Sequence, residues 1–167
     1  MAHSPADDTH AVTLAAYSRN AASLFRYALM LLANHAEAED AVQQVFTALA
    51  TRGVGGIDSM DGYLRTSIRN ECYSMLGRRR TQPDTNGLPL LEAVAANDAR
   101  SDDRLALEQG IRALPPDQRE VIHLKVFEGR SFQEIADMTG ESINTIASRY
   151  RYAMQKLRAA FGVEPAQ

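Results

Sequence analysis

Residues 131–161 contain the sequence pattern that most restricts how this chain can fold. Ser131 followed three residues later by Glu134 is a capping box, which marks the start of a helix. Gly140 suits the C-terminal cap of that helix, and Ser142 can cap a second helix directly after it. Apolar residues then recur every three or four positions. The pattern predicts two helices joined by a tight turn.

The polar face of the second predicted helix is basic. Residues 144–158 contain four basic side chains and no acidic one. The polar positions on this face are Thr145, Ser148, Arg149, Arg151, Lys156 and Arg158. A helix face that carries cations and hydroxyl groups suits contact with phosphates. A short turn before the helix can place it in a DNA groove. The segment therefore favours DNA binding, although a basic helical hairpin is also common as a plain solvated surface.

The composition indicates an all-α protein. The 167 residues include only 10 Gly and 6 Pro, and no run of alternating β-branched residues stands out. The net charge is −3, which is unusual for a DNA-binding protein, but the charge is unevenly distributed. Residues 81–103 hold five acidic side chains and one basic one. Salt screens charges beyond roughly 8–10 Å, so the local charge of a contacting face matters more than the total.

Several classes of function are disfavoured by what the sequence lacks. The single Cys72 excludes an intramolecular disulfide and a cysteine zinc site, and the four His have no ligand spacing. We expect no metal and no cofactor. Without a phosphate-binding glycine loop or a nucleophile elbow, we do not expect an enzyme. No signal-peptide pattern and no apolar run of roughly 20 residues occur, which predicts a cytoplasmic protein without a membrane partner.

Helical periodicity in the first half predicts one domain, at residues 12–80. Residues 1–11 look disordered, and three helices follow, over about 12–33, 36–51 and 61–79. We expect these helices to share one core. Asn34, three residues before Glu37, and Asp61 are the expected N-terminal caps of the second and third helices.

A second domain is predicted at residues 104–162. Pro, Gly, Asn and Asp appear in residues 81–103 and the helical period fades, which indicates a flexible acidic linker. After the linker, one helix stops at Pro115 and Pro116, and Asp117 can cap the next. The helix-turn-helix pattern completes the domain.

Four strings, in this order and spacing, resemble the extracytoplasmic-function sigma factors, the small initiation subunits of bacterial RNA polymerase. They are AEAEDAVQQVF (36–46), YLRTSIRNECYSMLGRRR (63–80), ALPPDQREVIHLKVFEG (113–129) and SFQEIADMTGESINTIASRYRYAMQKLR (131–158). The resemblance covers about residues 12–80 and 104–161. It implies a three-helix domain like sigma region 2 and a helix-turn-helix domain like sigma region 4.

The resemblance implies that the chain directs core RNA polymerase to promoter DNA and starts transcription. The segment expected to dock on a coiled coil of the largest polymerase subunit contains Glu39, Asp40, Gln43, Gln44 and Phe46. Phe46 also falls on the apolar stripe of its predicted helix. An ordinary solvated helix face is the alternative for the polar members. An anti-sigma factor is a further partner that the resemblance leaves open.

Two further sets of residues match parts of the family that contact DNA. The promoter-melting helix matches Tyr63, Arg65, Arg69, Asn70 and Tyr73, with residues 53–61 as the loop before it. The two tyrosines can instead cap the core. The recognition helix matches Thr145, Ser148, Arg149 and Arg151, and its arginines can contact either guanine edges or phosphates. The run of arginines at 78–80 can grip duplex phosphate or simply end a helix.

The sequence departs from the family pattern at several positions. Tyr63 stands where Trp is frequent, Ser74 where Asp is frequent, and Glu141 where an apolar residue is usual. Ala147 replaces a frequent Lys, and Tyr152 a frequent Arg. These changes put the promoter sequence and the strength of DNA binding in doubt rather than the fold.

Two rival functions remain open on sequence grounds. One is a stand-alone helix-turn-helix regulator that uses residues 1–80 for dimerisation or sensing. That function leaves the strings at 36–46 and 63–80 unexplained. The other is a sigma-like decoy that occupies anti-sigma partners, which the basic recognition helix disfavours.

Overall fold

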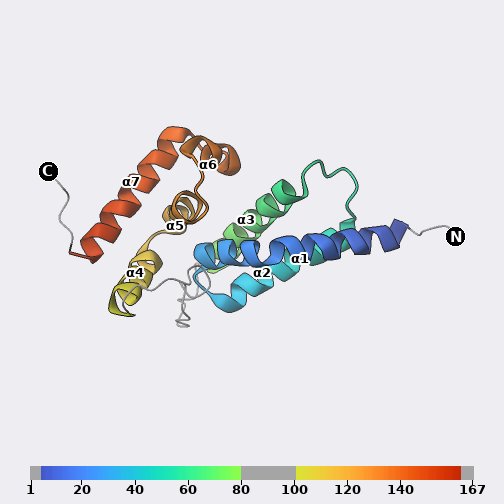
Figure 1. The fold of residues 1–167 in the computed structure, drawn as a ribbon, viewed down its shortest axis with the longest axis horizontal. Helices are drawn as coiled ribbons and strands as arrows, with labels where there is room; N and C mark the ends of the chain where they lie inside the picture. Colours follow the sequence, from blue (N-terminus) through green and yellow to red (C-terminus); the bar gives the residue numbers. More distant parts are fainter. Residues whose placement is uncertain (1–4, 80–100, 163–167) are drawn as a thin grey trace. The chain divides into compact units, whose positions relative to one another are not determined.

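The computed structural model describes residues 5–79 and 101–162, and each regular element in these ranges is a helix. The all-α prediction is confirmed. The chain divides into two units, residues 1–86 and 87–167 (Figure 1). Of the predicted linker, residues 81–100 lie outside the described ranges, whereas residues 101–103 already belong to a helix. The domain limits 12–80 and 104–162 stay predictions.

The first unit is a bundle of three helices, α1 (Pro5–Leu32), α2 (His35–Arg52) and α3 (Met60–Arg78). Each of the three contacts the other two (Figure 1). Their apolar faces close a core in which the largest fully buried side chains are Tyr27, Leu29, Met30, Leu31, Leu32, Leu49, Leu64 and Ile68. Free Cys72 is buried in the same core.

The first helix begins earlier than the sequence suggested. Residues 1–11 were expected to be disordered, but α1 starts at Pro5. A proline in the first turn and the acidic side chains of Asp7 and Asp8 both favour a helix start, because they suit its free amides and its dipole. The turn after α2 approaches this part of α1, since a Cβ added to Gly53 would lie 4.0 Å from the Thr9 hydroxyl oxygen.

One of the two predicted caps in the first unit is confirmed and the other is wrong. Asn34 accepts a hydrogen bond from the backbone N–H of Glu37 at 3.0 Å and caps α2. The cap of α3 is Ser59, not Asp61, and it accepts from the Gly62 N–H at 3.2 Å. Asp61 instead stands in the first turn, where its charge favours the helix dipole.

The second unit packs three shorter segments against one long helix. They are α4 (Ser101–Ala113), α5 (Pro116–Ile122) with a π-helical turn η2 (His123–Phe127), and α6 (Phe132–Thr139). Helix α7 (Ile143–Ala160) contacts α4, α5 and α6 (Figure 1). A Cβ added to Gly110 of α4 would lie 3.0 Å from the Leu157 side chain of α7, so the absence of a side chain there allows close approach. The buried side chains include Ile111, Leu114, Val121, Leu124, Ile135, Ile146 and Ala153.

One expectation for the middle of this unit is wrong. Pro115, not Asp117, occupies the N-cap of α5, and Asp117 stands in the first turn, where its carboxylate accepts a hydrogen bond from the Gln118 N–H at 3.0 Å. Val126 is 54 % exposed, whereas His123 is buried. The π-helical turn adds one residue to a helical turn and so rotates the side chains that follow it.

The end of α4 is capped by a side chain from α5. Buried Arg119 donates hydrogen bonds to the carbonyl oxygens of Leu114 at 2.7 Å and Arg112 at 3.3 Å. The last carbonyl groups of a helix have no helical N–H partner, and a cationic side chain can supply the missing hydrogen bonds. Among the described helices, none is long and apolar enough to cross a lipid bilayer.

Candidate nucleic-acid and protein interfaces

The capping box predicted at the start of the helix-turn-helix is formed. The Glu134 N–H donates to the Ser131 hydroxyl at 3.1 Å, and the Ser131 N–H donates to the Glu134 carboxylate at 2.7 Å. The Ser131 N–H that donates to the carboxylate, and after it the Ser131 hydroxyl, hold the pKa of Glu134 below its ordinary value, because they stabilise the charged carboxylate. The start of α6 is therefore fixed by local chemistry.

The turn between α6 and α7 is also built as the sequence predicted. Gly140 adopts the left-handed conformation with φ 73°, and its N–H donates to the Ala136 carbonyl at 2.9 Å. The Ser142 hydroxyl accepts from the Thr145 N–H at 3.1 Å and caps α7. The rings of Phe132 and Tyr150 meet edge to face, with centroids 5.4 Å apart. These contacts fix the direction of α7 relative to α6.

The outer face of α7 is polar and basic. Arg151, Lys156 and Arg158 are exposed, and Ser148 is half-buried beside them. The Arg151 guanidinium lies 5.3 Å from the ring centroid of Tyr152. The Thr145 hydroxyl is within 2.9 Å of the Ser142 hydroxyl at the start of the helix. Such a face can contact both the phosphates and the base edges of a duplex.

Arg149 does not share that outer face. Its Nε lies 3.1 Å from an Asp117 carboxylate oxygen, and one terminal nitrogen lies 2.9 Å from a Glu141 carboxylate oxygen. Its side chain is only 21 % exposed. The structure therefore places this predicted DNA contact in a link between α7, the first turn of α5 and the α6–α7 turn.

The predicted polymerase-docking residues separate into two groups. Glu39, Asp40, Gln43 and Gln44 are exposed along α2. Phe46 is 6 % exposed and packs edge to face on Tyr17 of α1, with ring centroids 5.0 Å apart. The apolar stripe predicted this buried position, and the Phe46 ring supports α2 from inside the bundle.

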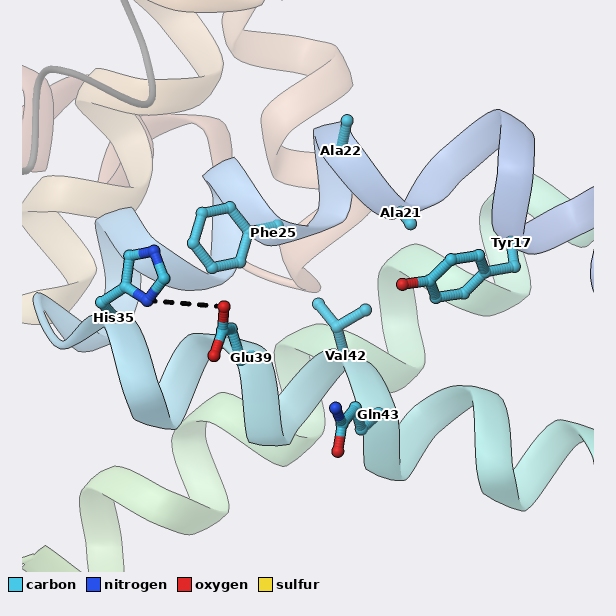
Figure 2. Close-up of a pocket in the computed structure, with 8 residues that line it drawn as sticks. All are labelled: Tyr17, Ala21, Ala22, Phe25, His35, Glu39, Val42 and Gln43. Atoms are coloured by element: carbon cyan, nitrogen blue, oxygen red, sulfur yellow. Dashed lines mark ion pairs between the residues drawn. The ribbon is translucent and has the colours of Figure 1, made fainter.

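A pocket of about 390 Å³ opens between α1 and α2, next to the polar docking residues. Figure 2 shows Phe25, His35 and Glu39 at one end and Tyr17 at the other, with Val42 between them. The His35 ring meets Phe25 edge to face at 5.0 Å, and its Nδ1 lies 3.6 Å from a Glu39 carboxylate oxygen. The pocket thus combines aromatic walls with one carboxylate.

The predicted promoter-melting residues lie along α3 in a series of arginine–aromatic contacts. The Arg69 guanidinium lies 4.7 Å from the ring centroid of Tyr73. At the other end of the helix, Arg52 of α2 lies 5.1 Å from the ring of Tyr63. Stacked arginine and aromatic groups form platforms for unpaired bases. Both rings are half-buried, which fits a base platform as well as the alternative that the two tyrosines only cap the core.

The other two melting residues are placed differently. Asn70 is exposed on α3. Arg65 is half-buried, and its guanidinium lies 5.3 Å from the ring of buried Tyr27 in α1. Arg65 therefore joins α3 to the core, whereas Asn70 faces solvent.

The arginines at the end of α3 do not act as one group. Arg79 pairs with Glu37 of α2 and donates to the Leu32 carbonyl at 2.8 Å, so it caps the end of α1. Arg78 pairs with Glu71 at 3.1 Å and is largely exposed, and Arg80 lies outside the described residues. The capping role of Arg79 gave no local signal, because its partners are more than 40 residues away.

Comparisons with known proteins agree on one family. Sigma-70 region 2 matches residues 16–82, and sigma-70 region 4 matches residues 104–157. The ECF RNA polymerase sigma factor SigL of Mycobacterium tuberculosis is 31 % identical over 159 residues, which cover 89 % of this chain and 88 % of SigL. The probable ECF RNA polymerase sigma factor SigI of the same species is 31 % identical over 172 residues. That match covers 95 % of this chain, but the chain spans only 59 % of the SigI length.

A solved structure is similar to most of the chain. The sigma factor RpoE from Bartonella quintana, in complex with the anti-sigma factor NepR, matches with a TM-score of 0.60 and 26 % identity. The match covers 95 % of this chain and 99 % of RpoE.

Proposed function

The chain belongs to the extracytoplasmic-function family of RNA polymerase sigma factors, and on that basis we propose that it directs bacterial core polymerase to promoter DNA and starts transcription there. Its role is regulatory rather than enzymatic, and its place of action is the cytoplasm. The proposal is supported by the exposed polar and charged faces that each unit carries. In the first unit these are the exposed acids and amides of α2 and the arginine–aromatic series of α3, and in the second the basic face of α7.

We propose that the α2 face binds the polymerase. Glu39, Asp40, Gln43 and Gln44 present carboxylates and amides to solvent, which suits a helical partner with a basic surface. Phe46 contributes from the core by supporting the helix.

We propose that α3 and the turn before it hold unpaired promoter bases. Tyr63 and Tyr73 are each accompanied by an arginine, and Asn70 is exposed between them. Stacking is worth about 1–3 kcal/mol per base, so two captured bases offset the few kcal/mol that unpairing costs.

We propose that α7 reads the upstream promoter element. Thr145, Ser148 and Arg151 supply its contacts to the duplex, while Arg149 holds the helix in position through Asp117 and Glu141. The exposed cations Lys156 and Arg158 add sequence-independent attraction to phosphate.

An anti-sigma factor is a further proposed partner. RpoE of Bartonella quintana, which is similar to this chain over nearly its whole length, was solved in complex with the anti-sigma factor NepR. A decoy function would use that partner alone, but it gives no reason for the basic face of α7. A stand-alone regulator gives no reason for the polar face of α2.

The proposed function is tested by adding the purified chain to bacterial core polymerase in a run-off assay on genomic promoter fragments. We expect co-purification with core and transcripts that depend on the added chain. Core binding without any transcript would favour the decoy. A chain that neither binds core nor starts transcripts would contradict the sigma assignment.

A further inference from the structure

The pocket between α1 and α2 has the chemistry of a receptor for one side chain of a partner. Its volume of about 390 Å³ lies at the small end of the range for ligand pockets, roughly 300–1,000 Å³. The aromatic rings of Phe25 and Tyr17 lie at the two ends of the pocket, and Val42 lines the space between them (Figure 2). A long side chain with an apolar stem can pack along the apolar surface between the two rings.

The carboxylate in the pocket is available to a cation. The Glu39 side chain is 58 % exposed, and its nearest ring nitrogen, on His35, lies 3.6 Å away, which is longer than a normal hydrogen bond. Exposed Asp40 is the next residue along α2 and adds a second negative charge to this turn of the helix. The local field therefore favours a positively charged group.

Among positively charged side chains, arginine fits this environment best. Its guanidinium stacks on aromatic faces and can bond a carboxylate with two parallel N–H groups, whereas the lysine ammonium is a strongly hydrated point charge. The Phe25 ring and the Glu39 carboxylate stand at the same end of the pocket (Figure 2).

We propose that this pocket receives an arginine side chain from the polymerase helix that docks on α2. The proposal rests on the proposed function and extends it to α1, which supplies Tyr17 and Phe25. The pocket is continuous with the proposed docking face, because Glu39 and Gln43 belong to both. The guanidinium of this arginine pairs with the Glu39 carboxylate and stacks on the Phe25 ring.

The test is a set of double-mutant cycles between the full chain and core polymerase. On the chain, Glu39→Gln removes the carboxylate charge, and Phe25→Leu removes the ring while keeping an apolar side chain. Phe25→Tyr keeps the ring, and Asp103→Asn removes an exposed carboxylate in the other unit; these are the controls. On the polymerase, each arginine and lysine of the coiled coil of the largest subunit is replaced in turn by alanine. Thermal unfolding verifies that each variant folds.

We expect Glu39→Gln and Phe25→Leu each to weaken core binding by about three- to tenfold. The two control variants should bind like the unchanged chain. For one arginine of the coiled coil, the affinity loss of the double variant should be smaller than the product of the two single losses. Removing either partner already removes the contact.

Two results would overturn the inference while leaving the proposed function intact. In the first, the unchanged chain binds core normally, but the double-mutant cycles show no coupling between the pocket variants and any arginine of the coiled coil. The other is coupling with a lysine alone. A chain that fails to bind core at all would instead refute the proposed function itself.

Discussion

The Arg149 side chain of α7 lies 3.1 Å from the Asp117 carboxylate in the first turn of α5. A second carboxylate, that of Glu141, lies 2.9 Å from the same guanidinium. Both acids hold the guanidinium on the side of α7 that faces its own domain. An ion-pair network therefore joins α7 to the first turn of α5 and to the α6–α7 turn.

Arg149→Ala should weaken binding to the upstream promoter element about equally for all sequences. The substitution loosens α7 without removing a base contact, so the preference at each base pair should survive. The measurement is competition of duplexes, each with one substituted base pair, for the complex of chain and core polymerase. Arg151→Ala, on the exposed face, is the comparison and should relax the preference at one position by about 1–3 kcal/mol if it reads a guanine. Loss of preference at one base pair in Arg149→Ala would show that this arginine reads DNA directly.

Asp40→Arg should weaken polymerase docking, because it places a positive charge on a face proposed to meet a basic partner. We expect at least a tenfold loss, about 1.4 kcal/mol or more, since like charges across an interface repel strongly. Binding is measured by titrating labelled chain with core polymerase. Asp103→Arg makes the same charge change in the other unit and should bind normally. Equal affinity of both variants would remove Asp40 from the docking face.

Arg79→Ala should destabilise the first unit by about 1–2 kcal/mol, because the Leu32 carbonyl and the Glu37 carboxylate both lose a charged donor. Urea unfolding followed by circular dichroism measures the change. Arg78→Ala is the matched control, and loss of its exposed pair with Glu71 should cost no more than roughly 1 kcal/mol. If the two variants unfold alike, Arg79 is not a cap.

Tyr73→Ala should slow promoter opening without changing core binding. The loss of one stacking surface is worth about 1–3 kcal/mol. Permanganate reactivity of unpaired thymines measures opening. Tyr73→Phe keeps the ring and should open promoters normally. A Tyr73→Ala variant that opens promoters at the full rate would assign this ring to the bundle surface alone.

Glu134 should titrate below its ordinary pKa of 4.5, and Ser131→Ala should raise that pKa toward 4.5. Because the pKa is lowered in the folded protein, the carboxylate stabilises the folded state above pH 4.5. That stabilisation disappears as the pH falls through the lowered pKa. Carboxyl chemical shifts followed by NMR test both statements. An ordinary pKa for Glu134 in the unchanged chain would mean that the capping box is not formed in solution.

Features set by neighbouring residues could be predicted from the sequence, whereas those set by distant contacts could not. Ser131, Gly140 and Ser142 act within one helical turn, so their caps were predicted correctly. Ser59 and Asp61 both carry a suitable oxygen two residues apart, and the local pattern did not distinguish them.

The contacts of site residues that the sequence did not indicate join distant parts of the chain. Asp117 precedes Arg149 by 32 positions in the sequence, so nothing near Arg149 signalled their pairing. The buried position of Phe46, by contrast, was predicted from the sequence, because the apolar residues of its helix recur at helical spacing. The family resemblance implied a place at the docking interface.

The most direct test compares DNA protection by the chain alone with protection by the chain plus core polymerase on one promoter fragment. Our account predicts weak protection by the chain alone. With core added, we expect two separated protected elements, an upstream duplex and a downstream segment that becomes reactive to single-strand probes. Strong protection of a single paired-repeat site by the chain alone, unchanged by core, would contradict the account.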